Sequence, residues 1–325
     1  MKKNILVTGA GGFIGGHISK ELIARGYNVR CVDIKPFDKW YQMFDSCENF
    51  QLDMTIKENC FEMCKNMNEV INMACNMGGM GFIENNKALC MLSVLVNTHM
   101  LMACKATEVR KYFFSSSACA YNTDLQKNPK IKGLKESDAY PAMPEDGYGW
   151  EKLFSERMCQ HFLDDYGLDV KVARYHNIYG PNGTYDGGRE KAPAALCRKT
   201  IECKIKKKET IDVWGDGNQT RSFLYIDDCV DATLKLLNSQ YHGPINIGSE
   251  EQVSINEMLD KIEKISQVKL NRNYQLDKPK GVNGRNSDNT LIRKTLGWDA
   301  KTTLYEGLEK TYSWIENEIK KKHNQ

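Results

Sequence analysis

The 325-residue chain has little net charge, no long apolar run and no closely paired cysteines. Its formal charge of +3 is too small to indicate nucleic acid or a charged membrane as a partner. The longest apolar stretch, residues 88–96, is too short to span a bilayer, so we expect no membrane segment. The opening Met-Lys-Lys resembles a charged leader, but the polar and glycine residues 8–12 interrupt the apolar run. A strand explains that run better than an export signal does.

The 12 cysteines are scattered, and none forms a Cys-X-X-Cys pair. Cys60 and Cys64 are the closest two, one helical turn apart, so the sequence predicts no metal site. Without an export signal, these cysteines are expected to be reduced thiols in a cytoplasmic protein. The content of 41% hydrophobic and 27% charged residues is that of an ordinary soluble globular protein.

A glycine-rich segment at residues 9–15, Gly-Ala-Gly-Gly-Phe-Ile-Gly, separates an apolar strand at 3–8 from a helical pattern. In that context Gly9 permits a tight turn, and Gly12 lets the backbone approach a pyrophosphate. Gly15 lets the helix pack closely against the strand. The phosphates would meet free N–H groups at the positive end of the helix. The segment therefore predicts a dinucleotide site.

Acidic residues end the next two predicted strands. Asp33 follows a strand at 28–32, and a carboxylate there accepts hydrogen bonds from a ribose diol and repels a 2′-phosphate. This favours NAD over NADP, with Lys35 as the main counter-argument. Asp53 follows a third strand and is well placed for the adenine edge. The alternative is a Rossmann-like fold that binds no dinucleotide. The predicted cofactor-binding residues are Gly9, Gly12, Phe13, Ile14, Gly15, Asp33, Asp53, Tyr148 and Lys152.

Tyr148 and Lys152 stand four apart at the head of a predicted helix, which puts both side chains on one face. A lysine ammonium there favours the phenolate and is expected to lower the pKa of the tyrosine. The pair could then remove a hydroxyl proton while a hydride leaves the same carbon. Ser117, in a serine run after a strand at 111–114, could orient the same hydroxyl. The alternative is a serine that caps a turn.

Strands and helices alternate through the first half of the chain, which predicts an α/β fold with a doubly wound parallel sheet. Residues 1–176 are expected to form an NAD-binding Rossmann domain. Residues 177–325 are expected to form a smaller C-terminal α/β substrate lobe, with segments at about 211–248 returning to the first domain.

Two further segments carry predictions. The loop at 76–82 is rich in glycine and methionine, so we expect its backbone to lie close to a nicotinamide or a sugar. The pattern at 88–104 is helical and apolar nearly all round, as in a helix buried on more than one side. Together with the helix that carries Lys152, it is expected to form a homodimer interface.

These motifs, in this order, resemble the extended short-chain dehydrogenase/reductase family. They are Gly-X-X-Gly-X-X-Gly, an acidic strand end, Ser-Ser-Ser-Ala, Tyr-X-X-X-Lys and Arg-Tyr-X-Asn-X-Tyr-Gly-Pro. The resemblance covers nearly the whole chain. It implies an NAD-dependent enzyme that acts on a nucleotide-diphosphate sugar.

Six segments are similar to the GDP-mannose 3,5-epimerase family, namely residues 76–83, 116–119, 176–181, 187–195, 214–223 and 284–289. This resemblance implies a GDP-linked sugar whose C3 and/or C5 is inverted through a 4-keto intermediate. Tyr148, held by Lys152, would be the base at C4, with Ser117 beside it. Cys119 and Lys191 would be the acid/base pair on the two faces of the ring. The implied substrate-binding residues are Gly78, Met80, Ser117, Cys119, Asn177, Glu190, Lys191, Lys199, Gln219, Arg221 and Arg285.

The chemistry explains why such a site needs two proton-transfer groups. A ketone at C4 makes the C3 and C5 protons acidic, and hydrogen bonds stabilise the resulting enolate. A single base could return the proton only to the face it came from. Arg221 and Arg285 are natural diphosphate clamps, because a guanidinium binds phosphate in a forked geometry.

Three other functions stay open at this stage. A 4,6-dehydratase needs a carboxylate beside the serine, where this chain has Ala118 and Cys119. A 4-epimerase needs no thiol or amine across the ring. The last alternative is an NAD-sensing scaffold that is not an enzyme.

Overall fold

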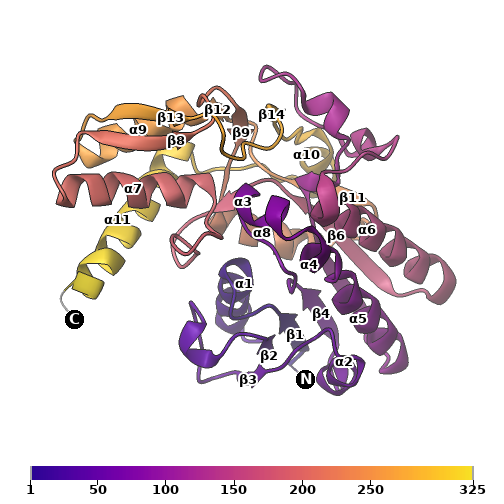
Figure 1. Ribbon diagram of the computed structural model, residues 1–325. Helices are drawn as coiled ribbons and strands as arrows, with labels where there is room; N and C mark the ends of the chain where they lie inside the picture. Colours follow the sequence, from indigo (N-terminus) through magenta and orange to yellow (C-terminus); the bar gives the residue numbers. More distant parts are fainter. Residues whose placement is uncertain (1, 324–325) are drawn as a thin grey trace.

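The computed structural model describes residues 2–323 and contains a seven-stranded, wholly parallel sheet (Figure 1). The strand order is β11-β6-β5-β4-β1-β2-β3, so the chain reverses its direction of travel next to β1. In such sheets, ligands bind outside the carboxyl ends of the strands at this point. The strands are β1 (Asn4–Thr8), β2 (Asn28–Asp33), β3 (Glu48–Gln51), β4 (Glu69–Asn72), β5 (Lys111–Ser117), β6 (Asp169–Tyr175) and β11 (Pro244–Ile247).

Helices cover both faces of this sheet, which confirms the predicted fold class (Figure 1). Alternate residues of a strand point to opposite faces, so Ile5 and Val7 of β1 pack into one core and Leu6 packs into the other. The first core contains α1 (Phe13–Ala24) and α8 (Ile226–Leu237). The second contains α2 (Lys57–Cys64), α5 (Val94–Ala106) and α6 (Asp146–Tyr166).

The C-terminal half builds smaller sheets beside the main one. β8 (Thr210–Trp214) pairs with β13 (Asn271–Gln275), and β9 (Thr220–Ser222) lies between β12 (Gln252–Ser254) and β14 (Gly284–Arg285). The helices α7, α9 and α11 pack against one another around these strands. The remaining elements are β7 (Ile178–Tyr179), β10 (Leu224–Tyr225), α7 (Ala192–Ile205), α9 (Ile255–Ser266), α10 (Thr290–Leu296) and α11 (Leu304–His323).

Within residues 211–248, β11 joins the main sheet beside β6, whereas β8 pairs outside it. The division of the chain near residue 176 stays a prediction. The short helical elements are α3 (Met80–Asn85), α4 (Lys87–Met91), η1 (Phe37–Lys39), η2 (Ala118–Ala120), η3 (Thr123–Gln126) and η4 (Glu136–Ala139).

The apolar helix predicted at 88–104 is divided into α4 and α5 by a turn at Leu92 and Ser93. Ser93 is buried there, and its hydroxyl accepts a hydrogen bond from the N–H of Asn76 at 2.8 Å. The whole stretch Lys87–Ala106 is long and apolar enough to cross a membrane, so the expectation that its apolar run is too short was wrong. A core helix meets the same two criteria, and Met100 and Leu101 of α5 are fully buried in the second core.

Candidate active site

The glycine-rich turn joins β1 to α1 at the carboxyl edge of the main sheet. Gly9 has φ +67°, and a Cβ there would lie 2.9 Å from the backbone of Met73. Gly12 is the N-cap of α1, and a Cβ on Gly15 would lie 2.2 Å from the carbonyl oxygen of Gly9. The first turn of α1 holds no acidic residue, so its N–H groups present a positive end. The turn fits the phosphates of a dinucleotide.

Phe13 and Ile14 follow this turn, but their side chains pack into the protein. The Phe13 ring lies against Gly183 and meets His17 edge-on, with 5.6 Å between the ring centroids. Ile14 packs against the core beneath α1. Their predicted part in cofactor binding therefore falls to their backbone N–H groups.

The two strand-end carboxylates differ in their surroundings. Asp33 is buried at the end of β2, and its Oδ1 accepts the N–H of Lys35 at 3.0 Å. The Lys35 ammonium donates to the carbonyl of Gly11 at 3.4 Å, so this lysine folds over the glycine-rich turn. Oδ1 of Asp53 caps its own turn through the N–H and the hydroxyl of Thr55, both at 2.8 Å. Contact of either carboxylate with a cofactor stays a prediction.

The glycines after β4 lie close to other parts of the chain. A Cβ on Gly79 would lie 2.4 Å from the carbonyl oxygen of Glu190, and a Cβ on Gly78 would meet the Phe82 ring. The close partners of these glycines are therefore parts of the same chain. The predicted approach of this backbone to a nicotinamide or a sugar stays a prediction. Met80 begins α3, and its thioether lies against Gly281.

Ser117, Cys119 and Tyr148 come together where β5 ends and α6 begins. The Ser117 hydroxyl accepts the N–H of Cys119 at 3.2 Å and lies close enough to Tyr148 to lower the pKa of its phenol. The Cys119 carbonyl accepts the N–H of Glu145 at 2.9 Å, which holds the start of α6 against this turn. A Cβ on Gly149 would lie 2.3 Å from the same carbonyl, so only glycine fits. The sequence therefore predicted this cluster correctly as a group of neighbours.

The expected effect of Lys152 on Tyr148 was wrong for this structure. Burial raises the pKa of Tyr148 well above its ordinary value, and the neighbouring Cys75, Cys119 and Glu151 act in the same direction. The Lys152 ammonium lies 3.3 Å from Glu151 Oε2, and both side chains are about 1% exposed. Burial opposes the charge of Lys152, but Cys75 and Glu151 raise its pKa. The lysine charge is thus shared with a buried carboxylate and does not act on the phenol alone.

Arg285 is held by three side chains from distant parts of the chain. Its Nε donates to Gln126 Oε1 at 2.6 Å, its Nη1 to Cys119 Sγ at 3.3 Å and its Nη2 to Glu145 Oε2 at 2.7 Å. All these side chains are buried or nearly so. The guanidinium of Arg285, which was predicted to clamp a diphosphate, is therefore held beside the Cys119 thiol.

The charges of this group act on the thiol from several sides. Burial raises the pKa of Cys119, the Glu145 carboxylate raises it further, and the Arg285 cation opposes both. Burial disfavours the charge of Glu145 as well, but Arg285 brings the net pKa of this carboxyl below its usual value. Cys119 is therefore a protonated thiol beside an ionised carboxylate.

Lys191 is the N-cap residue of α7 and is close enough to Cys119 for their charges to interact. Burial lowers the pKa of the Lys191 ammonium, and the neighbouring acidic groups of Cys119 and Cys75 act in the opposite direction. A lysine with a lowered pKa has a larger neutral fraction, so Lys191 is able to act as a base.

Three predicted substrate residues are engaged within the C-terminal half. The Asn177 amide donates to the carbonyl of Ser222 at 3.0 Å, and Glu190 accepts from Arg198 at 3.3 Å. The Lys199 ammonium donates to the carbonyl of Asp212 at 2.9 Å. These contacts fix the side chains, and their contact with a substrate stays a prediction.

Gln219 and Arg221 flank the start of β9. The Gln219 amide donates to the carbonyl of Trp214 at 3.0 Å, whereas its Oε1 is buried without a partner among residues 2–323. The guanidinium of Arg221 donates to the carbonyls of Thr220, Lys280 and Val282, at 2.7–3.1 Å. Burial and the nearby Arg285 lower the pKa of Arg221 to about 10. As with Arg285, the predicted role as a diphosphate clamp stays untested.

Residues 5–248 match the NAD dependent epimerase/dehydratase family. The chain belongs to this family. GDP-mannose 3,5-epimerase 1 of Oryza sativa subsp. indica is 44% identical over 100% of this chain and 84% of its own length. GDP-mannose 3,5-epimerase of Arabidopsis thaliana is 43% identical over 98% of this chain and 83% of its own.

Solved structures agree with this membership. A UDP-glucose 4-epimerase from Thermotoga maritima superposes with a TM-score of 0.87 at 24% identity, over 97% of this chain and 99% of that one. A UDP-glucuronic acid 4-epimerase from Bacillus cereus, in complex with NAD, has a TM-score of 0.80 at 26% identity, covering 97% and 96%. The first likeness shows the fold alone.

Family membership identifies the cofactor as NAD, and the glycine-rich turn of this member fits it. The N–H groups at the start of α1 would hold the pyrophosphate, and Asp33 would meet the adenosine ribose. Bound NAD supplies a hydride acceptor. The chain itself supplies the hydroxyl of Ser117 at the end of β5 and the phenol of Tyr148 at the start of α6.

Three residues of the site were not predicted from the sequence. Glu145 and Gln126 hold Arg285, and Cys75 lies beside Lys152 and Tyr148. Glu145 had one detectable signal, because it stands three residues before Tyr148 at the head of the same helix. Gln126 had none, since its partner is 159 residues away.

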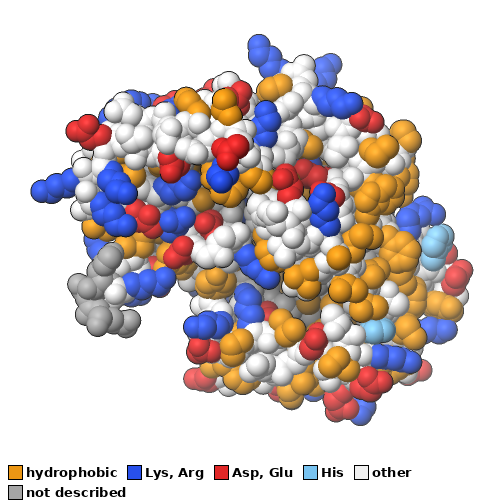
Figure 2. Space-filling model, in the orientation of Figure 1, with side chains coloured by type: hydrophobic (Ala, Val, Ile, Leu, Met, Phe, Trp, Pro, Cys, Tyr) orange, Lys and Arg blue, Asp and Glu red, His pale blue; other side chains and the backbone are white. Residues whose placement is uncertain are grey.

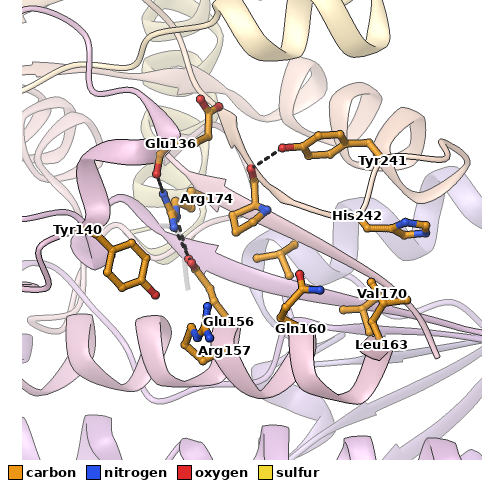
Figure 3. Close-up of a pocket in the computed structure, with 12 residues that line it drawn as sticks. Glu136, Tyr140, Glu156, Arg157, Gln160, Leu163, Val170, Arg174, Tyr241 and His242 are labelled. Carbon is orange, nitrogen blue, oxygen red and sulfur yellow. Dashed lines mark hydrogen bonds and ion pairs between the residues drawn. The ribbon is translucent and has the colours of Figure 1, made fainter. Parts of the chain in front are cut away.

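A cavity of about 210 Å³ lies elsewhere, between α6 and the strands β6 and β11 (Figure 3). None of the predicted site residues lines it. Figure 3 shows Arg174 between the Glu136 backbone and the Glu156 carboxylate. Glu156 also accepts from Ser116, the neighbour of Ser117, so this ion pair ties α6 to the end of β5. This ion pair therefore helps to fix the strand end that carries Ser117.

Proposed function

We propose that the protein is an NAD-dependent epimerase that inverts C3 and/or C5 of a GDP-linked sugar through a 4-keto intermediate. The observation that carries this proposal is the contact of Cys119 with Arg285 and Glu145, close to Lys191. A thiol and an amine near the same phenol are what opposite-face proton transfer requires. The 44% identity to a GDP-mannose 3,5-epimerase supports the same substrate class.

The first step oxidises the sugar at C4. Tyr148 takes the proton of the C4 hydroxyl, with Ser117 hydrogen bonded to the same oxygen, and bound NAD would supply the acceptor for the C4 hydride. The Lys152 ammonium lies 5.4 Å from the centre of the Tyr148 ring, and it shares its charge between the phenol and Glu151. The resulting ketone makes the protons at C3 and C5 acidic.

The second stage inverts the neighbouring carbon. The neutral amine of Lys191 removes a proton from one face and becomes an ammonium, and the electrons move into an enolate on the C4 oxygen. Ser117 and Tyr148 stabilise this oxygen by hydrogen bonds. The Cys119 thiol then gives its proton to the opposite face and becomes a thiolate. Tyr148 then returns its proton to the C4 oxygen, where bound NADH would supply the hydride that restores the alcohol. Exchange with solvent returns a proton to Cys119 and removes one from Lys191.

Turnover without an added cofactor tests this proposal. The purified protein is incubated with GDP-mannose, and the products are separated by chromatography against epimer standards. We expect new GDP-hexose peaks without consumption of reductant. If neither GDP-mannose nor any other nucleotide sugar is converted, the NAD-sensing scaffold gains support instead.

We also infer a homodimer formed by the faces of α4, α5 and α6. Figure 2 shows hydrophobic side chains gathered over these helices. Leu92 and Leu95 are 53% and 38% exposed, and Trp150 and Phe154 are 44% and 53% exposed. A two-fold axis brings such a face onto its own copy, where apolar side chains are complementary to themselves.

Light scattering after size exclusion tests this interface. Leu95→Glu with Phe154→Glu should give a monomer, because two buried carboxylates would face their copies across the axis. Leu276→Glu is the control, because Leu276 is 74% exposed on a different part of the chain. A monomeric wild type would contradict the interface.

The free cysteines are compatible with a cytoplasmic location, which remains our proposal.

A further inference from the structure

The guanidinium of Arg285 links a thiol to a carboxylate. Its Nη1 contacts Cys119 Sγ at 3.3 Å, its Nη2 contacts Glu145 Oε2 at 2.7 Å, and Gln126 fixes its Nε. The contacts come from β14, η2, the segment before α6 and η3. A flat guanidinium with three engaged nitrogens has one orientation, so the carboxylate determines which nitrogen faces the sulfur.

We propose that Glu145 is a positioning residue that holds Arg285 against Cys119 and keeps a proton on this thiol, so that Cys119 acts as the proton donor. This inference rests on the proposed function, which gives Cys119 a proton to transfer. Glu145 acts through Arg285 and through its own negative charge beside the thiol. It has no part in the carbon chemistry itself.

Charged and titratable groups reach Cys119 from every element that packs around it. The anion is Glu145, and the cations are Arg285, Arg221 and Lys191, with the hydroxyls of Ser117 and Tyr148 beside them. Among residues 2–323, Glu145 is the carboxylate that acts most strongly on the Cys119 thiol. Its negative charge and burial raise the pKa of Cys119, whereas Arg285 lowers it.

Removal of the Glu145 charge should therefore free the cations to stabilise a thiolate. Glu145→Gln keeps an acceptor for Arg285 and a similar volume, so it removes the charge and little else. We expect the pH at which Cys119 loses its proton to fall by about one unit or more. The wild-type thiol should ionise above the value of about 8.5 for a free cysteine.

The test is the alkylation of Cys119 by iodoacetamide as a function of pH, read from the Cys119 peptide by mass spectrometry. This measurement needs no substrate, so it is independent of whether the proposed function is right. Glu84→Gln is the matched control, because Glu84 on α3 interacts with Glu145 through charge but is absent from the contacts of Arg285. We expect the alkylation midpoint to fall in Glu145→Gln and to stay in place in Glu84→Gln.

Two results would overturn the inference. One is a wild-type alkylation midpoint below about 8.5, which needs no variant at all. The other is an unchanged midpoint in a folded Glu145→Gln protein, with NAD binding as the check on folding. If Glu145→Gln does not fold, Glu145→Asp keeps the charge and should keep the high midpoint, and a fall there contradicts the account. Activity is the second readout, since Glu145→Gln should lower kcat more than it changes KM.

Discussion

The guanidinium Nη1 of Arg285 lies 3.3 Å from the sulfur of Cys119, and both side chains are buried. A cation this close to a thiol affects the proton affinity of the sulfur and the orientation of the thiol group. The same guanidinium is neutralised by Glu145, so the thiol faces an ion pair. Arg285 and Cys119 lie where the end of β5, the start of α6 and β14 meet. These elements are distant in the sequence, and only folding brings them together.

Replacement of Arg285 by lysine keeps the charge but loses the forked contacts. We expect kcat to fall by about 100-fold, because lysine cannot hold Gln126, Cys119 and Glu145 at once. Arg293→Lys is the control, since Arg293 forms its ion pairs at the surface. Steady-state kinetics of both variants check this, and a wild-type kcat in Arg285→Lys would contradict it.

Tyr148→Phe removes the phenol that accepts the C4 hydroxyl proton. Turnover should fall by about 1,000-fold, while the bound NAD per chain stays as in the wild type. The cofactor content of the purified protein and the rate of product formation measure the two effects separately. Tyr241→Phe, which removes a hydroxyl beside the cavity of Figure 3, should leave both unchanged. Equal losses in the two variants would count against Tyr148.

The pH profile of kcat/KM should be bell-shaped. Burial lowers the pKa of Lys191, so the activity should rise as this amine loses its proton below the ordinary lysine value of about 10.4. Burial and Glu145 raise the pKa of Cys119, so the activity should fall as this thiol loses its proton, above about 8.5. Residual activity of Cys119→Ser should lack the falling limb. A falling limb that persists in this variant belongs to another group.

The ion pair between Glu156 and Arg174 predicts a large effect on stability. Arg174 Nε and Nη2 donate to the two carboxylate oxygens at 2.9 and 2.6 Å in the interior. Glu156→Ala leaves a buried, unpaired guanidinium, so unfolding should become easier by about 3 kcal/mol or more. Glu21→Ala breaks an exposed pair with Arg25 and should cost well under about 1 kcal/mol. Urea denaturation compares them, and equal shifts would contradict the argument.

The sequence predicted the fold because the pattern that carries it is local. Apolar strands, the glycine turn and the Tyr-X-X-X-Lys helix each occupy a few consecutive residues, and the alternation of elements implies the parallel sheet. Strand ends in such a sheet meet at one edge, which is why Ser117 could be placed at the site in advance. Tyr148 was grouped with it through the motifs of the family resemblance. The small sheets of the C-terminal half had no comparable pattern, since β9 pairs with strands on both sides over three residues or fewer.

The parts that could not be predicted depend on distant contacts. Arg285 meets Gln126 and Glu145 across 159 and 140 residues, and no local pattern specifies such pairs. The glycines at 78 and 79 are small because another part of the chain lies against them, which a sequence does not distinguish from a ligand. The pKa of Tyr148 was misjudged because burial raises it, and because Glu151 shares the charge of Lys152 inside the protein.

The central claim is that a ketone at C4 makes the adjacent protons exchangeable, and that Cys119 delivers a solvent-derived proton to the face opposite Lys191. Incubation with GDP-mannose in D2O, followed by NMR of the recovered sugar nucleotides, tests it most directly. The account predicts deuterium at C3 and/or C5 of the inverted products and none at C4. Products inverted at C4 alone, with no deuterium at either neighbour, would contradict it.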